Sequence, residues 1–223
     1  LACIYPFLIY YFQEKGLSYI EMGIVFAVIS ITGVIVQPIW GFITDKYSNK
    51  RTIMMIVMFL SGVFVYSLIF ANGFYVIILS IILLMSFQSP VVPIADAYSY
   101  EIIEQYKKLQ YGKIRLMGSF GYAVVALIMG YVVKYSGINS SYIIYSALML
   151  LGVMLLVSIN YKGKGTRKNV NFNDMINLIR DRKFTLLLTS VILTNIANGS
   201  NSSYIPILIE KTGGDVTQLG IVW

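Results

Sequence analysis

Residues 41–51 read Gly41-Phe42-Ile43-Thr44-Asp45-Lys46-Tyr47-Ser48-Asn49-Lys50-Arg51, a short charged segment between two long apolar runs. The run before it covers about residues 20–43, and the run after it covers about residues 53–71. Each run is long enough to cross the ~30 Å hydrocarbon core of a bilayer, because a helix rises about 1.5 Å per residue. The segment is therefore predicted to be a loop at a membrane surface between two transmembrane helices.

The composition agrees with a chain whose main solvent is lipid. Hydrophobic residues make up 57% of the sequence and charged residues 12%, and the mean hydropathy is +0.74. A soluble domain of this size needs charge over most of its surface. The apolar runs do not alternate with polar residues as the strands of a membrane barrel do, so we expect helices.

Four further apolar runs of suitable length lie at about residues 74–98, 114–133, 141–160 and 184–207. Residues 1–12 and 218–223 resemble parts of two more spans. The sequence thus predicts an all-α membrane protein with six complete transmembrane helices plus partial helices at both ends. We also expect the chain to be a piece of a longer protein.

Basic residues indicate the orientation of the chain in the membrane. Alternate loops hold 14 of the 17 Lys and Arg residues: Lys46, Lys50, Arg51, Lys107, Lys108, Lys113, Arg115, Lys162, Lys164, Arg167, Lys168, Arg180, Arg182 and Lys183. By the positive-inside rule these loops face the cytoplasm, and the protein is expected in the cytoplasmic membrane as a multi-pass protein. The rule also accounts for the net charge of +7 without a nucleic-acid partner.

The two ends of the chain share a pattern that suggests an internal repeat. Tyr5-Pro6-Phe7-Leu8-Ile9 is followed by Glu14-Lys15 and Gly23-Ile24-Val25, and Ile205-Pro206-Ile207-Leu208-Ile209 is followed by Glu210-Lys211 and Gly220-Ile221-Val222. Six predicted crossings separate the two copies, which is the period of the parallel repeats in many secondary transporters. Chance similarity between apolar segments is the alternative.

The charged loop and the repeat together resemble the major facilitator superfamily. Its signature between helices 2 and 3 is Gly-x-x-x-Asp-Arg/Lys-x-Gly-x-Arg/Lys-Arg/Lys, which Gly41, Asp45, Lys46, Lys50 and Arg51 match. Ser48 stands where the family usually has Gly. The resemblance implies that residues 41–51, hereafter the latch loop, form a conformational latch that breaks as two six-helix halves rock.

This resemblance divides the chain into three parts. Residues 1–160 correspond to the first six-helix half with a truncated helix 1, and residues 161–183 to the cytoplasmic loop between the halves. Residues 184–223 correspond to helix 7 and the beginning of helix 8. Within the superfamily the chain is most similar to lactose permease and the related phenylpropionate permeases, through Gln37-Pro38-Ile39-Trp40-Gly41, Asp96-Ala97 and Tyr111-Gly112-Lys113-Ile114-Arg115-Leu116-Met117-Gly118-Ser119.

Asp96 and Arg115 are the leading candidates for substrate binding. Asp96 lies late in an apolar span that contains Pro90 and Pro93, and an ionisable residue inside a membrane span is functional by default. In the lactose-permease branch the corresponding acid and arginine bind the sugar, so the resemblance implies that role here. A structural ion pair is the competing interpretation. Asp96 is also the candidate for proton coupling.

Three further residues complete the predicted substrate site. Tyr122 stands where the family places a tryptophan that stacks on the sugar ring, and an aromatic face of tyrosine can serve the same purpose. Asn198 and Asn201 stand where lactose permease has two acids, and they lie in an unusually polar part of the predicted helix 7. Their amides suit hydroxyl groups of a substrate, although hydrogen bonds between helices explain them equally well.

The resulting prediction is a secondary active transporter for a small polar solute, most plausibly a sugar or a nucleoside. It would work by alternating access, with proton symport as the expected mode, lipid as its surroundings and a monomer as the functional full-length unit. The alternatives are a seven-helix receptor and an intramembrane enzyme. Cys3 is the single cysteine and the chain has no histidine, so no metal site and no cofactor are expected. The sequence also offers no activated nucleophile of the kind that an intramembrane enzyme would need.

Overall fold

The computed structural model describes residues 1–47, 49–106, 110–158 and 181–186, together with Thr189, Ser190, Leu193, Thr194, Leu208, Ile209 and Thr217. In residues 1–158 the ordered elements are helices. They are η1 (Tyr5–Phe7), α1 (Leu8–Glu14), α2 (Tyr19–Tyr47), α3 (Lys50–Phe64), α4 (Ser67–Phe70), α5 (Phe74–Gln88), α6 (Val91–Gln105), α7 (Tyr111–Ser136) and α8 (Asn139–Ser158). The prediction of an all-helical chain is confirmed.

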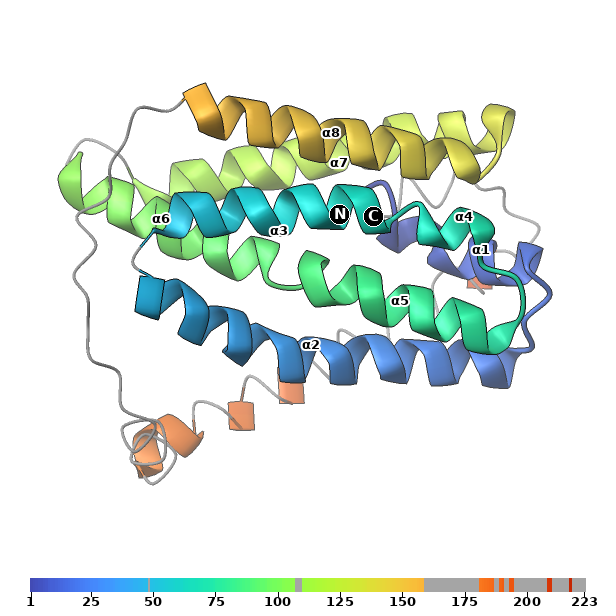
Figure 1. Ribbon diagram of the computed structural model, residues 1–223, viewed down its shortest axis with the longest axis horizontal. Coiled ribbons are helices and arrows are strands. Elements are labelled where there is room, and N and C mark those ends of the chain that lie inside the picture. The colour runs from blue at the N-terminus through green and yellow to red at the C-terminus, as the bar shows by residue number, and fades with distance from the viewer. Residues whose placement is uncertain are drawn as a thin grey trace.

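Five helical segments in the described part are long and apolar enough to cross a membrane. They are Tyr19–Tyr47, Lys50–Phe70, Phe74–Gln105, Tyr111–Ser136 and Asn139–Ser158, and they run side by side along the long axis of the bundle (Figure 1). These five match five of the six predicted spans. The sixth, at residues 184–207, lies largely outside the described residues.

The latch loop is shorter than its sequence suggests, because helix α3 begins at Lys50 rather than near residue 53. The side chain of Asn49 accepts a hydrogen bond of 3.2 Å from the backbone N–H of Thr52. This is an N-terminal cap, which satisfies one of the backbone donors that a helix start leaves unpaired. Lys50 and Arg51 therefore belong to the first turn of α3.

The span Phe74–Gln105 is interrupted halfway, between α5 and α6, at Ser89 and Pro90 (Figure 1). A proline has no backbone N–H, so Pro90 removes the helical partner of the Ser86 carbonyl, four residues earlier. The indole N–H of Trp40 in α2 donates to that carbonyl at 2.9 Å. The helix is thus broken at Pro90, and a side chain of α2 supplies the donor that the proline removes.

The centre of the bundle is built from α3, α5 and α8 with the short N-terminal helices. A Cβ at Gly62 in α3 would lie 3.2 Å from the Cβ of Met149 in α8, so these two helices approach closely. Ser61 and Tyr145 share a short hydrogen bond across the same interface. Tyr11 of α1 donates to the carbonyl of Leu68 in α4 at 2.8 Å, which attaches the N-terminal helices to the end of the span Lys50–Phe70.

Candidate functional site

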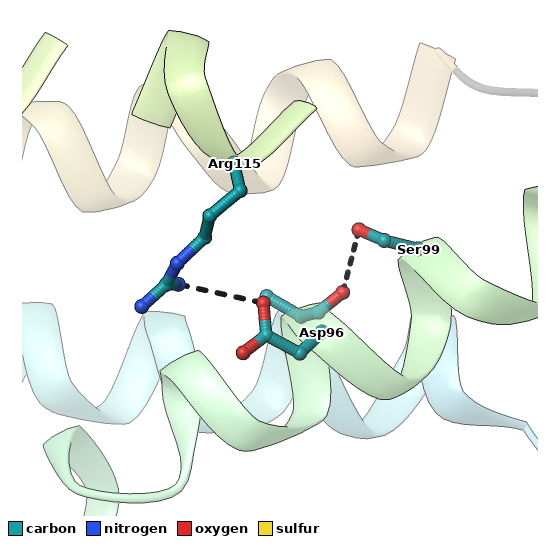
Figure 2. A network of polar contacts seen from close by, with 4 residues as sticks. Asp96, Ser99 and Arg115 are labelled. Carbon is teal, nitrogen blue, oxygen red and sulfur yellow. Dashed lines mark hydrogen bonds and ion pairs between the residues drawn. The ribbon is translucent and has the colours of Figure 1, made fainter. Parts of the chain in front are cut away.

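Asp96 and Arg115 lie opposite each other on neighbouring helices. Arg115 extends from the first turns of α7 toward the carboxylate of Asp96 in the middle of α6 (Figure 2), and Nη1 of Arg115 is 3.5 Å from Oδ1 of Asp96. The two side chains are 57% and 34% exposed. The structure therefore brings together the two residues that the sequence singled out first.

The geometry of this pair is loose. Charge-assisted N–H···O bonds are typically 2.7–2.9 Å long, and arginine often binds a carboxylate through two parallel bonds. Here a single contact of 3.5 Å joins the two groups. Such a partly exposed ion pair contributes at most about 1 kcal/mol to stability. A guanidinium and a carboxylate each have several hydrogen-bonding positions, and this contact uses one position of each.

The antiparallel hairpin of α6 and α7 explains why the two residues meet. Asp96 precedes the end of α6 at Gln105 by nine residues, and Arg115 follows the start of α7 at Tyr111 by four. Nearer to the connecting loop, the rings of Tyr100 and Tyr111 stack with centroids 4.4 Å apart and an interplanar angle of 15°. This aromatic contact was not anticipated from the sequence.

Tyr122 lies on the same helix as Arg115, seven residues further along. Seven residues are close to two helical turns, so both side chains lie on one face of α7, about 10 Å apart along its axis. Tyr122 is half-buried. The other two predicted substrate contacts, Asn198 and Asn201, lie outside the described residues.

The basic end of the latch loop has partners inside the bundle. Nζ of Lys50 is 3.3 Å from Oε2 of Glu101 in α6. Nη2 of Arg51 donates to the carbonyl of Val157, near the end of α8, at 2.7 Å. These contacts join the start of α3 to the last turns of α6 and α8. They also place these loop-proximal ends at one end of the bundle, as the alternation of basic loops predicts.

The other three matched positions of the latch loop face outward. Gly41, Asp45 and Lys46 are exposed in the described part of the chain, and a Cβ at Gly41 would meet nothing within 4 Å there. Nζ of Lys46 lies 6.0 Å from the ring centroid of Phe42 and 5.8 Å from that of Tyr47. The role of these residues as a latch between two halves remains a prediction.

Sequence reasoning missed the partners that complete these contacts. Glu101 had a local signal, because it is an acid at the end of an apolar span. The carbonyl of Val157 had no such signal in the sequence, because every residue has a carbonyl group. Among the residues that the structure describes, no cluster of three or more His, Cys, Asp or Glu side chains is arranged to hold a metal ion.

Comparison with known proteins identifies the family. A family model described as the MFS_1 like family matches residues 1–223. The maltose permease of Geobacillus stearothermophilus is 25% identical over 223 residues, which are 100% of this chain and 56% of that protein. The lactose permease of Klebsiella oxytoca is 28% identical over 173 residues, 71% of this chain and 40% of its own length.

A sucrose permease of Escherichia coli is 23% identical over 193 residues, covering 80% of this chain and 45% of the permease. The chain thus spans about half the length of the curated relatives it matches. These relatives are transporters rather than enzymes or receptors, and the similarity to the maltose permease extends across the whole chain. The chain is a multi-pass membrane protein that belongs to the MFS_1-like family of the major facilitator superfamily.

Proposed function

We propose that the full-length protein transports a sugar across the cytoplasmic membrane by alternating access, and that Asp96 and Arg115 bind the sugar hydroxyls. The observation that carries this proposal is the accessible, loosely held ion pair between α6 and α7. A carboxylate only accepts hydrogen bonds and a guanidinium only donates them. A hydroxyl group does both, so a polyol can contact both side chains together.

The relatives favour a sugar over the nucleoside that the sequence left open. Four of the similar proteins are named as permeases for maltose, lactose, melibiose and sucrose. Maltose, lactose, melibiose and sucrose are all disaccharides, which present many hydroxyl groups and few charges. A disaccharide is therefore the first substrate class to test. Tyr122 would add an aromatic surface for the C–H groups of a sugar ring.

Uptake of radiolabelled maltose, lactose, melibiose and sucrose by cells expressing the full-length protein tests this proposal. Asp96→Asn and Arg115→Lys should each reduce uptake of the transported sugar by about 10- to 100-fold, because a hydrogen bond to a charged group contributes about 1.5–3 kcal/mol. Lys113→Gln, an exposed neighbour in the same turn, is the matched control and should transport normally. Normal uptake in either test variant would exclude the assigned site.

Proton symport with Asp96 as the proton carrier is the proposed mode of coupling. One proton crossing ~100 mV supplies about 2.3 kcal/mol, enough for roughly 50-fold accumulation of a sugar. Addition of the transported sugar to energy-depleted cells should make the medium more alkaline as protons enter. Sugar uptake without alkalinisation would indicate uniport or antiport and would remove Asp96 as the carrier.

A further inference from the structure

Ser89 presents unpaired polar groups at the centre of a membrane span. Ser89 and Pro90 are the two central residues of the span Phe74–Gln105. The hydroxyl of Ser89 is buried and has no hydrogen-bond partner among the described residues. Pro93 has no backbone N–H, so the Ser89 carbonyl, four residues earlier, also lacks its helical donor. One residue thus offers both a hydroxyl and a carbonyl in the middle of the span.

The depth of Ser89 suggests what its polar groups bind. Irregular backbone occurs at membrane depth only where it is buried in protein or lines a water-filled cavity. In secondary transporters the substrate site lies near the bilayer midplane, and interrupted helices typically form it. The Ser86 carbonyl, which Pro90 leaves without a helical donor, is satisfied by the Trp40 indole at 2.9 Å. The described part of the chain gives the Ser89 hydroxyl no such partner, and a substrate at this depth can pair with it.

The course of the backbone relates Ser89 to the ion pair. Ser89 has φ −61° and ψ −35°, and Pro90 has φ −79° and ψ −10°, so both residues stay close to the right-handed helical region. Asp96 follows Ser89 by seven residues, which is close to two turns. The two short side chains therefore lie on a similar side of the span, about 10 Å apart along its axis.

Tyr122 lies at about the same depth on the neighbouring helix. It follows Arg115 by seven residues, the same spacing that separates Ser89 from Asp96. Because α6 and α7 form an antiparallel hairpin, Ser89 and Tyr122 both lie about two turns farther from the connecting loop than the ion pair. Tyr122 is also half-buried and close to the middle of its own span, Tyr111–Ser136.

We propose that Ser89 forms a second sugar subsite, opposite Tyr122, which binds one ring of a disaccharide while Asp96 and Arg115 bind the other. A single pyranose ring is too short to contact both Asp96 and Ser89, whereas two linked rings can contact both. The second subsite would therefore set a preference for disaccharides over monosaccharides. This inference rests on the proposed function, because it requires a sugar held by Asp96 and Arg115.

The chemistry of Ser89 suits this role. A serine hydroxyl can donate one hydrogen bond and accept others, as a sugar hydroxyl does, and the carbonyl adds a further acceptor. Ser89 as a whole residue is half-buried. Rotation about χ1 moves its hydroxyl among three staggered positions without displacing the backbone. Tyr122 can cover the face of the same ring with its aromatic surface.

The test compares a disaccharide with its own parts in cells that express the full-length protein. KM is measured for whichever of maltose, lactose, melibiose and sucrose is taken up fastest. The inhibition constant Ki is measured for the constituent monosaccharide that inhibits this uptake more strongly. Ser89→Ala should raise the KM of the disaccharide about fivefold, equivalent to about 1 kcal/mol, and should leave the Ki of the monosaccharide within about twofold of the wild type.

Ser86→Ala is the matched control, because Ser86 lies one turn earlier in the same span and its hydroxyl already donates to the Ile82 carbonyl at 2.7 Å. A KM of Ser89→Ala within about twofold of the wild type would overturn the inference. An equal rise in Ki would overturn it too, since the substitution would then disturb the first ring. So would an equal rise of KM in Ser86→Ala. If neither monosaccharide inhibits uptake, the KM values of the two serine variants decide.

Failure of this inference can be distinguished from failure of the proposed function. If Asp96→Asn and Arg115→Lys transport normally, or none of the four disaccharides is taken up, the proposed sugar site itself is wrong. If both variants lose transport while Ser89→Ala keeps the wild-type KM, the site stands and only the second subsite is excluded. Equal amounts of each variant in the membrane, measured by immunoblot, are required for either conclusion.

Discussion

The hydrogen bond from Trp40 to Ser86 leads to a quantitative prediction. Pro90 leaves the Ser86 carbonyl without a helical donor, and the Trp40 indole replaces that donor at 2.9 Å. Trp40→Phe removes the indole N–H but retains an aromatic ring next to Phe87, whose ring centroid is 6.0 Å from that of Trp40. The carbonyl would then have no donor in the middle of a membrane span.

The size of the effect follows from the surroundings. Hydrogen bonds between membrane helices contribute about 0.6 kcal/mol on average and about 1.7 kcal/mol at most. The Trp40 bond is partly buried and has good length, so we expect about 1 kcal/mol. Trp40→Phe also shrinks the side chain, which has its own packing cost. A double-mutant cycle is therefore needed to isolate the hydrogen bond.

Pro90→Ala supplies the second arm of the cycle. Alanine restores a backbone N–H that can donate to Ser86, so Trp40→Phe should cost about 1 kcal/mol less in the Pro90→Ala background than in the wild type. Pro93→Ala is the matched control, because its N–H would face the carbonyl of Ser89 instead. The free energy of unfolding of the full-length protein in detergent micelles, titrated with SDS and followed by circular dichroism, provides the measurement.

The reasoning would be refuted if Trp40→Phe had the same cost, within about 0.3 kcal/mol, in the wild-type and Pro90→Ala backgrounds. An equal rescue by Pro93→Ala would refute it as well. That result would mean that removal of any proline from the span Phe74–Gln105 compensates for the smaller ring in the Trp40→Phe variant. The Ser86 carbonyl would then have no specific role.

Two further predictions concern packing within the bundle. Gly62→Ala should destabilise the protein by about 1–3 kcal/mol, because the new Cβ would lie 3.2 Å from the Cβ of Met149. Gly152→Ala should reduce stability less, because its Cβ would meet only the flexible end of Met58. Thermal unfolding of both variants tests this difference. Gln88→Met should raise the unfolding temperature, because the buried Gln88 amide has no hydrogen-bond partner among the described residues; a lower unfolding temperature would show that this amide is satisfied in the full-length protein.

The helical spans could be predicted because they depend on composition and length alone. Residues 74–98 were recognised as a span that contains Pro90 and Pro93, and the break at Pro90 is a local effect, because a proline disrupts its own helix. The start of α3 at Lys50 was predicted less well. Its position depends on the Asn49 cap, which contributes to helix formation without adding hydrophobicity.

Tertiary contacts were harder to predict, because their partners are distant in sequence. Asp96 and Arg115 were paired through a family resemblance. The Tyr100–Tyr111 stack follows from the same antiparallel arrangement, since each tyrosine is one turn nearer to the loop. That spacing was visible in the sequence, but it acquires meaning only when the two helices are placed side by side with Asp96 facing Arg115.

The contacts of the latch loop bear on how its substitutions should be interpreted. Lys50 contacts Glu101 and Arg51 contacts the Val157 carbonyl within the described helical bundle, and the side chains of Lys50 and Glu101 are only 26% and 14% exposed. Asp45 is exposed and makes no ion pair among the described residues. Loss of the Arg51–Val157 contact between helices is therefore sufficient to explain a transport defect in an Arg51 variant. Asp45 has no such ion pair among the described residues, so an Asp45 variant can report on the predicted latch without that complication.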